Sequence, residues 1–290
     1  MKIAVVTGAS SGMGWECAIR LWEQFPGLDE IWAVGRRKER LEKLEENVNI
    51  PVRKFALDLS QEKDRGILKD ELVRLKPQVK FLVNGAGFGK IGNVCDLSEK
   101  DQVGMIQVNC EALTAVTTMV LPFMPQNSRI LQFASSAAFL PQPGFAVYAA
   151  SKAYVLSYSR ALNRELKTRK IFVTAICPGP VRTEFFDIAQ TTGEIPLYKK
   201  LVMADPGKVV AKAIRDSIAG KRSFCIWYFY EGIPLACESA ASQPDLRYHG
   251  KKSSMHQEKN VGKDKGPGNR FLRAYNRKTG DKSRICRNWK

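Results

Sequence analysis

Residues 3–14 have the sequence IAVVTGASSGMG, an apolar run that passes directly into a glycine-rich turn. Apolar residues at helical spacing follow over residues 17–25. A strand, a tight turn and a helix N-terminus make an anion site, because free backbone N–H groups and the positive end of the helix dipole face the same point. The spacing Gly8-x3-Gly12-x-Gly14 differs from the common dinucleotide-binding turn, G-x-G-x-x-G. A glycine turn without a ligand is the alternative.

The second apolar run, residues 31–34, ends in Gly35-Arg36-Arg37. In a dinucleotide-binding fold an acidic residue after this strand binds the adenosine ribose, whereas an arginine there accommodates a 2′-phosphate. This chain has two arginines and no acid at that point, so the sequence predicts NADP(H) over NAD(H), with Arg36 as the preferred phosphate contact. The alternative is that both arginines only begin a charged helix over residues 38–46.

Tyr148 and Lys152 lie four residues apart and therefore share one face of a helix. An ammonium near a phenol favours the phenolate, so we expect the pKa of Tyr148 to be drawn from about 10 towards neutral. Ser135 follows the apolar run at residues 130–133, at the carboxyl end of a strand, where open α/β sheets place ligands. Such a Ser/Tyr/Lys set can transfer protons without histidine. A Tyr-x-x-x-Lys pattern alone recurs by chance, and most helical tyrosines are core or surface residues.

Strand-like runs alternate with helical patterns along most of the 290 residues. This alternation predicts an α/β fold, a single doubly wound parallel sheet of Rossmann-like type with helices on both faces. A helix capped by Asp205 is expected from Pro206 to Ile218. The expected strands include residues 3–7, 31–34, 81–83, 130–133, 171–176 and 224–227.

Over roughly residues 1–230 the chain resembles the short-chain dehydrogenase/reductase family of the TGxxxGxG/YxxxK type. The resemblance implies hydride transfer between a nicotinamide and a carbonyl/alcohol pair. The family often has two asparagines before Ala-Gly, whereas here Gly85 follows Asn84; we expect a local change at the fourth strand and no loss of activity. The motifs that carry the resemblance are residues 7–14, Asp58, residues 84–87 (Asn-Gly-Ala-Gly), Asn109, Ser135, Tyr148 with Lys152, and Pro178-Gly179 with Thr183.

The resemblance also implies roles for the matching residues. Tyr148 would be the proton donor, and Ser135 would hydrogen-bond the substrate oxygen. Lys152 would bind the nicotinamide ribose, and Asn109 would hold a water that links the lysine to solvent. Asp58 would contact the adenine and Thr183 the carboxamide; alternatively, Asn109 is an ordinary buried polar residue and Thr183 a helix cap. The catalytic set is Asn109, Ser135, Tyr148 and Lys152, and the cofactor-binding set is Gly8, Ser10, Ser11, Gly12, Met13, Gly14, Arg36, Asp58, Asn84, Ala86, Gly87, Tyr148, Lys152, Pro178, Gly179 and Thr183, with no metal ligands.

The substrate is expected under a lid over about residues 184–204, a segment rich in apolar side chains. Phe88, Phe139 and Phe145 are candidates for the same wall. A lipophilic carbonyl compound, such as a steroid, a ring ketone or an acyl chain, fits this lid better than a sugar does. The alternative is that the lid packs its apolar side chains into a small core of its own.

The composition excludes some catalytic classes and indicates the state of the thiols. The only histidines are His249 and His256, so a Ser-His-Asp hydrolase or a His-ligated catalytic zinc is excluded from the main domain. Seven scattered cysteines without a C-x-x-C pair, in a chain without a secretory signal, favour reduced thiols and a cytoplasmic location. We expect no membrane span, because no apolar stretch reaches about 20 residues. By resemblance, a homo-dimer or tetramer is expected through helices near residues 97–121 and 145–167.

The domain is expected over residues 1–231, followed by a basic tail, residues 232–290. Residues 244–290 hold 14 Lys or Arg against four Asp or Glu, a net +10 of the total +17. Three interpretations stay open: an arm that binds nucleic acid or an anionic surface, a disordered tail without a partner, or an aberrant end produced by a shifted reading frame. A shifted reading frame would produce the abrupt change in composition that follows Tyr230.

The sequence thus predicts an NADP(H)-dependent oxidoreductase acting on a lipophilic ketone or secondary alcohol, with Tyr148 as general acid and base. A 3-oxoacyl-thioester reductase would use the same residues and differ in its lid and docking surface. A nucleotide-binding regulatory protein whose basic tail binds nucleic acid is a rival of another class. The intact Ser/Tyr/Lys set argues against it, because a pure binding protein needs no proton donor.

Overall fold

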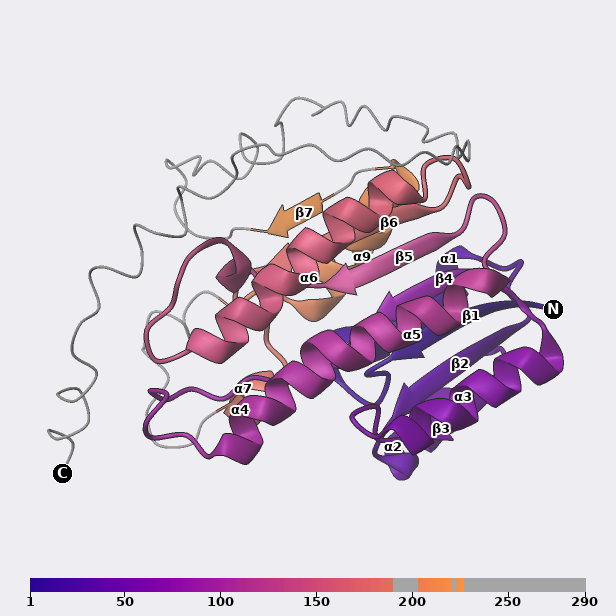
Figure 1. The fold of residues 1–290 in the computed structure, drawn as a ribbon. Helices are drawn as coiled ribbons and strands as arrows, with labels where there is room; N and C mark the ends of the chain where they lie inside the picture. Colours follow the sequence, from indigo (N-terminus) through magenta and orange to yellow (C-terminus); the bar gives the residue numbers. More distant parts are fainter. Residues whose placement is uncertain (190–202, 221–222, 227–290) are drawn as a thin grey trace, which may run out of the picture. The chain divides into compact units, whose positions relative to one another are not determined.

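The structure is a computed structural model that describes residues 1–189, 203–220 and 223–226. Its centre is a seven-stranded sheet with the order β3-β2-β1-β4-β5-β6-β7, and every neighbouring pair is parallel (Figure 1). The predicted fold class is therefore confirmed. The strands are β1 (Lys2–Thr7), β2 (Glu30–Gly35), β3 (Val52–Ala56), β4 (Gln78–Asn84), β5 (Arg129–Phe133), β6 (Phe172–Pro178) and β7 (Ser223–Ile226).

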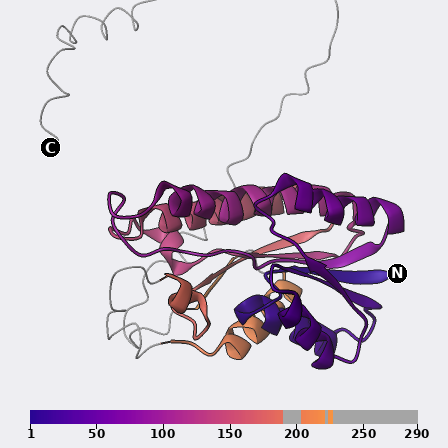
Figure 2. The same ribbon diagram turned by 90° about the horizontal axis from the view of Figure 1, so that it is seen from below.

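Helices cover both faces of the sheet. Helices α1, α2 and α9 pack on one face, and α3, α5 and α6 on the other (Figure 2). The bounds are α1 (Gly12–Gln24), α2 (Lys38–Glu46), α3 (Glu62–Leu75), α4 (Glu99–Ile106), η1 (Gln107–Ala112), α5 (Leu113–Val120), η2 (Leu121–Phe123), η3 (Ser136–Phe139), α6 (Ala146–Glu165), α7 (Phe185–Ala189) and α9 (Pro206–Ile218).

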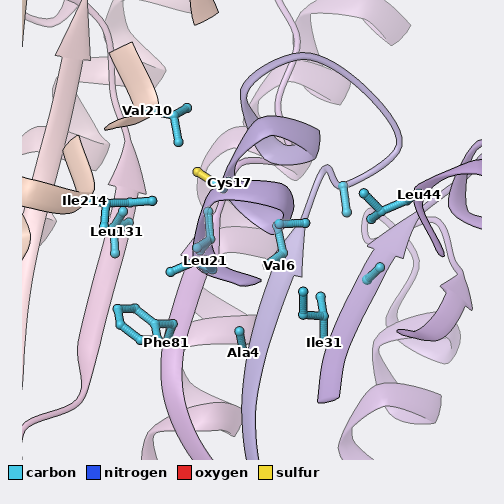
Figure 3. Packing of buried hydrophobic residues seen from close by; sticks show 14 of the residues in the cluster. Ala4, Val6, Cys17, Leu21, Ile31, Leu44, Phe81, Leu131, Val210 and Ile214 are labelled. Atoms are coloured by element: carbon cyan, nitrogen blue, oxygen red, sulfur yellow. The ribbon is translucent and has the colours of Figure 1, made fainter. Parts of the chain in front are cut away.

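The alternation of side chains along β1 divides the core into two layers. Ala4 and Val6 point towards the layer of α1 and α9, whereas Ile3 and Val5 point towards that of α3 and α5. All four side chains are fully buried, which explains why the run is continuously apolar instead of alternating. Figure 3 shows the first layer, where Leu21 and other buried side chains gather around Val6.

The strand order places a topological switch between β1 and β4. The chain moves outwards from β1 to β2 and β3, then crosses back to β4 on the other side of β1. In such sheets a crevice opens at the carboxyl ends of the two strands that flank the switch. Gly8 and Gly85 follow these two strands directly, so the topology brings the two glycine-containing segments to one edge.

The predicted helix at residues 206–218 is confirmed, and the Asp205 side chain accepts a hydrogen bond from the Lys208 backbone N–H at 2.9 Å. The helix expected near residues 97–121 differs in its middle, where η1 is a π-helix. A π-helical turn inside an α-helix frequently marks a functional site, and nothing in the sequence pattern predicted it.

One helical stretch among the described residues, Glu99–Phe123, is long and apolar enough to cross a membrane by length and composition, which the sequence analysis did not anticipate. Within its most apolar window, 44% is buried inside the fold. Val116 and Val120 of this stretch belong to the core beside the sheet. This packing accounts for its apolar character.

The predicted lid is described only at its ends, residues 184–189 and 203–204. Residues 190–202, Trp227 of the expected last strand and the predicted tail with both histidines lie outside the described residues. The two ends of the lid segment meet beside β6, where Val181 and Ala204 form an isolated bridge. The Arg182 backbone N–H donates to the Ala204 carbonyl at 3.0 Å, and the Ala204 N–H donates to the Pro180 carbonyl at 2.9 Å. The described residues before and after positions 190–202 are therefore hydrogen-bonded to each other.

Candidate active site

The glycine-rich turn after β1 forms only because glycine has no side chain at its closest contacts. Gly8 has a φ of +70°, and a Cβ there would lie 2.7 Å from the Gly85 carbonyl, while a Cβ on Gly14 would lie 2.3 Å from the Gly8 carbonyl oxygen. Only glycine permits both approaches without a shift of the backbone. Ser11, at the N-cap of α1, makes no side-chain capping hydrogen bond, so the first N–H groups of the helix are left for a ligand.

Thr7 fastens the end of β4 to β1. Its hydroxyl donates to the Val83 carbonyl at 3.3 Å and accepts from the N–H groups of Gly85 and Ala86 at 3.1 and 3.2 Å. A Cβ on Gly85 would lie 2.8 Å from the Thr7 carbonyl oxygen. The departure from the family pattern at Gly85 thus coincides with a close contact between the two strands that flank the crevice.

A cavity of about 250 Å³ opens at this switch point. Of the residues predicted to bind the cofactor, it is lined by Gly8, Ser10, Ser11, Gly12, Met13, Gly14, Arg36, Asp58, Ala86, Gly87 and Thr183. The predicted residues outside its wall are Asn84, Asn109, Ser135, Tyr148, Lys152, Pro178 and Gly179.

The side chain of Asn84 points into the core and not into the cavity. It is 2% exposed, and its amide nitrogen donates to the Thr117 hydroxyl at 2.9 Å and to Gln132 Oε1 at 3.0 Å. Any contact between Asn84 and a cofactor must therefore come from its backbone. Asp58, in contrast, lies at the cavity wall, and its Oδ1 accepts hydrogen bonds from the Ser60 N–H and hydroxyl.

The two arginines after β2 differ in their surroundings. Arg36 is exposed at the cavity wall and makes no hydrogen bond or ion pair with the part of the chain that the structure describes. Arg37 Nη1 lies 2.7 Å from Glu184 Oε2, and Arg40 Nη2 lies 3.1 Å from the other carboxylate oxygen. These arginines, Arg37 first, hold the pKa of Glu184 below its ordinary value. Glu184 is 147 residues from Arg37, so the sequence analysis had no local signal for this contact.

Ser135, Tyr148 and Lys152 come together beneath the cavity. Tyr148 is 7% exposed, and the nearby Ser135 side chain influences its pKa. Lys152 Nζ donates to the Phe133 carbonyl at 2.8 Å and lies 5.7 Å from the centroid of the Tyr148 ring. The Ala137 N–H donates to Ser135 Oγ at 3.2 Å, which holds this hydroxyl at the end of β5. The predicted proximity of the three side chains is therefore observed.

The expected direction of the Tyr148 pKa was wrong. Burial raises the pKa of Tyr148 from 10.0 to about 12, and the hydrogen bond from Ser135 offsets only part of the rise. Burial also lowers the pKa of Lys152 from 10.5 to about 8. Desolvation of the charged forms thus outweighs the attraction between ammonium and phenolate. The structure favours a protonated phenol at neutral pH, the form that a proton donor requires.

Asn109 lies in the π-helical turn, and its side chain makes three hydrogen bonds within the protein. Its amide nitrogen donates to the Phe88 carbonyl at 2.9 Å and to the Ser151 hydroxyl at 3.0 Å, and its oxygen accepts from the Phe88 N–H at 3.0 Å. Gly87, which lines the cavity, packs between Asn109 and Lys152. The side chain of Asn109 therefore positions the loop after β4, and the unpredicted π-turn brings it there.

Aromatic rings close over Tyr148. Phe145 stacks on it with ring centroids 4.2 Å apart, and Phe185 of α7 lies at 5.3 Å. A Cβ on Gly89 would lie within 2.9 Å of all three rings, so the absence of a side chain at Gly89 lets the rings pack against the backbone there. Phe88 packs with the same group, as expected, whereas Phe139 packs with a different cluster that includes Val155. Of the three side chains predicted for the substrate wall, Phe88 and Phe145 therefore lie beside Tyr148, and Phe139 packs elsewhere; the wall itself stays a prediction.

Comparison with known proteins agrees with this geometry. A family model described as short chain dehydrogenase matches residues 2–192. The chain is 34% identical over 201 residues to sulfoacetaldehyde reductase 2 of Chromohalobacter salexigens, a match covering 66% of this chain and 77% of that protein. It is similar to a solved short-chain dehydrogenase from Sphingobium yanoikuyae in complex with NADPH (TM-score 0.67, 25% identity, 83% of this chain and 92% of the other). A 3-ketoacyl-(acyl-carrier-protein) reductase from Brucella melitensis complexed with NADH has the same TM-score and identity, with 78% and 96% covered.

The buried ammonium of Lys152 gives a testable dependence of stability on pH. Lys152→Met removes the cost of desolvating the charge, so we expect the free energy of unfolding at pH 7 to rise by about 1–3 kcal/mol. Between about pH 8 and 10.5 folded wild type binds fewer protons at Lys152 than the unfolded chain does, so its stability should rise relative to the variant and the gap should close. Urea titrations at pH 7, 8.5 and 10 measure this difference.

Lys38→Met is the matched control, because the Lys38 side chain is 70% exposed. It should change neither the stability at pH 7 nor its pH dependence appreciably. A constant gap between wild type and Lys152→Met across the three pH values would contradict the lowered pKa of Lys152.

Proposed function

The chain belongs to the short-chain dehydrogenase family and is an oxidoreductase with a nicotinamide cofactor; from this premise we propose that it transfers hydride between NADP(H) and a lipophilic ketone or secondary alcohol. The observation that carries the proposal is the buried Ser135/Tyr148/Lys152 group, enclosed by aromatic rings next to a glycine-lined cavity. The cofactor supplies the hydride. All other steps belong to side chains of this chain.

In the direction of reduction, Tyr148 gives its hydroxyl proton to the substrate oxygen. Its raised pKa keeps that proton in place at neutral pH. Ser135, which lies close enough to the phenol to affect its pKa, donates to the same substrate oxygen and stabilises the charge that develops there. Lys152, held by the Phe133 carbonyl, binds the ribose hydroxyls next to the nicotinamide and supports the phenolate once the proton has left.

The lining of the cavity supports binding of a dinucleotide there. The turn between Gly8 and Gly14 leaves no room for a Cβ, which lets a pyrophosphate approach the backbone N–H groups closely. Asp58, the proposed adenine contact, and Thr183, the proposed carboxamide contact, line the same cavity, and Thr183 lies beside Gly12. We infer preference for NADP(H) from Arg36, a guanidinium without a protein partner in the described residues, at the position where a 2′-phosphate is bound.

The apolar character of the substrate rests on the rings around Tyr148. Phe88, Phe145 and Phe185 offer few polar groups to a substrate next to the proton donor. Reduction of a 3-oxoacyl thioester is the second candidate, because the similar Brucella protein is a reductase of that class. Rates with NADPH and a panel of ring ketones, compared with rates on a 3-oxoacyl thioester, distinguish the two.

We also propose a homo-oligomer in the cytoplasm. Val103, Ile106 and Tyr154 lie on α4 and α6 with 46%, 43% and 42% of their surface exposed, which suits contact with a second copy. Cys17, Cys95, Cys110 and Cys177 are free thiols, which suits a reducing compartment.

Tyr148→Phe should lower kcat by at least about 100-fold, because only the proton donor is removed. Binding of NADPH, measured by nicotinamide fluorescence, should change less than twofold. Tyr154→Phe on the same helix is the control: its hydroxyl is exposed and bonds only Thr114 among the described residues, so turnover should be retained. Near-normal rates for Tyr148→Phe would refute the proposed mechanism.

Arg36→Asp should reverse the cofactor preference. The carboxylate repels a 2′-phosphate and accepts hydrogen bonds from a 2′-hydroxyl, so NADPH binding should weaken at least about tenfold while NADH binding is retained or improved. Fluorescence titrations with both cofactors measure this. Lys38→Asp introduces the same change in charge two residues away, outside the cavity wall, and should alter the ratio little. An unchanged ratio for Arg36→Asp would place phosphate recognition elsewhere.

Deletion of residues 232–290 should leave kcat/KM for the best ketone within about twofold, because every proposed site residue lies before the tail. Circular dichroism checks that the shortened protein folds. A folded but inactive product would contradict the proposed domain limits and would favour a function that depends on the tail.

A further inference from the structure

The segment after β6, residues 184–189, contacts both the arginines after β2, here called the adenosine end of the site, and Tyr148, its catalytic end. Glu184 pairs with Arg37 and Arg40 at the adenosine end, and the next residue, Phe185, covers Tyr148 at the catalytic end. Its far end is fixed to the loop after β4, where the Ile91 N–H donates to the Ala189 carbonyl at 2.9 Å. A change in the position of Glu184 therefore acts directly on the cover of Tyr148.

The Glu184 contact is well formed and yet easy to displace. Each carboxylate oxygen bonds a different arginine, at 2.7 and 3.1 Å. All three side chains are 37–49% exposed, a range in which ion pairs contribute little to stability. A ligand with a higher charge can replace such a carboxylate.

A 2′-phosphate is that ligand. Arginine binds phosphate through the same parallel N–H groups that it offers to a carboxylate. Ser10, Arg36, Arg37 and Glu184 line the same cavity, and Arg37 Nη2 lies 3.5 Å from the Ser10 carbonyl. The carboxylate of Glu184 thus binds the guanidinium of Arg37, in the part of the cavity where the adenosine end of the cofactor is proposed to bind.

The geometry points to Glu184 as an internal counter-ion that determines cofactor discrimination: a 2′-phosphate competes with it for Arg37, and its displacement loosens α7 over Tyr148. This inference rests on the proposed use of NADP(H). It adds Glu184, from the segment after β6, to Arg36, the residue after β2 from which the preference for NADP(H) is inferred. It also couples binding of the phosphate to access to the proton donor.

The shortness of α7 makes this coupling physically reasonable. Phe185–Ala189 is a single helical turn, closed by the Ile188 N–H donating to the Glu184 carbonyl at 3.2 Å. Isolated turns of this length are unstable in water and need tertiary contacts. Glu184 supplies one such contact at the start of the turn, and the ring of Tyr148 beside Phe185 supplies another.

The first test uses two half-cofactors that differ only in the phosphate, adenosine 2′,5′-bisphosphate and adenosine 5′-monophosphate. Isothermal titration of wild type and Glu184→Gln should show bisphosphate binding about fivefold tighter in the variant and monophosphate binding unchanged, as loss of one exposed ion pair predicts. Glu23→Gln is the control, since it also removes a carboxylate paired with an arginine, Arg20, outside the cavity wall. It should bind both nucleotides as wild type does.

The outcomes separate the two proposals. If wild type prefers the bisphosphate and Glu184→Gln leaves its affinity unchanged, the inference is overturned and the NADP(H) proposal stands. If wild type and variant alike bind both nucleotides equally, the NADP(H) proposal falls and this inference with it.

The second test measures amide hydrogen exchange in α7, the part of the segment after β6 that follows Glu184. Bisphosphate has no nicotinamide, so any effect on α7 must come through the adenosine end. Amide hydrogen exchange of a peptide covering residues 185–189 should accelerate with saturating bisphosphate and not with monophosphate, and in Glu184→Gln it should be fast without ligand. Exchange that bisphosphate does not accelerate would overturn the coupling.

Discussion

The close approach of β1 and β4 at the glycine turn is the constraint on which the rest of the site depends. Gly8, Gly14 and Gly85 lie so near each other's backbones that a Cβ on any of them would overlap a carbonyl group. The Thr7 hydroxyl then links the two strand ends through three hydrogen bonds. Because the first turn of α1 follows directly, its backbone N–H groups open into the crevice at the switch point.

Burial decides the protonation of the catalytic group. The sheet and α6 remove Tyr148 and Lys152 from water, and the cost of desolvation favours the neutral form of each. The Ser135 side chain lowers the pKa of Tyr148 in part, and the Phe133 carbonyl accepts a hydrogen bond from Lys152. The fold thus maintains an uncharged phenol beside a weakened base, an arrangement that can hold or release a proton as charge develops near it.

Much of the site could be predicted because its residues are close in sequence or follow strands. The glycine turn, Arg36, and Ser135 with Tyr148 and Lys152 all lie where the strand and helix patterns placed them. The direction of the Tyr148 pKa was wrong, because burial decides it and no local pattern encodes burial. Packing also turned the Asn84 side chain into the core and placed Phe139 in another cluster, and neither outcome depends on local pattern.

The sequence by itself determined the parallel α/β class, the family and the order of the motifs, because apolar runs, glycine spacing and the Tyr-x-x-x-Lys interval are local features of the chain. Only the tertiary structure decided that Arg37 and Arg40 pair with Glu184, that a π-turn aims Asn109 at Phe88, and that aromatic rings enclose Tyr148. These contacts join residues far apart in the chain. Their formation depends on the distance and burial that the folded sheet imposes, and no local periodicity encodes either quantity.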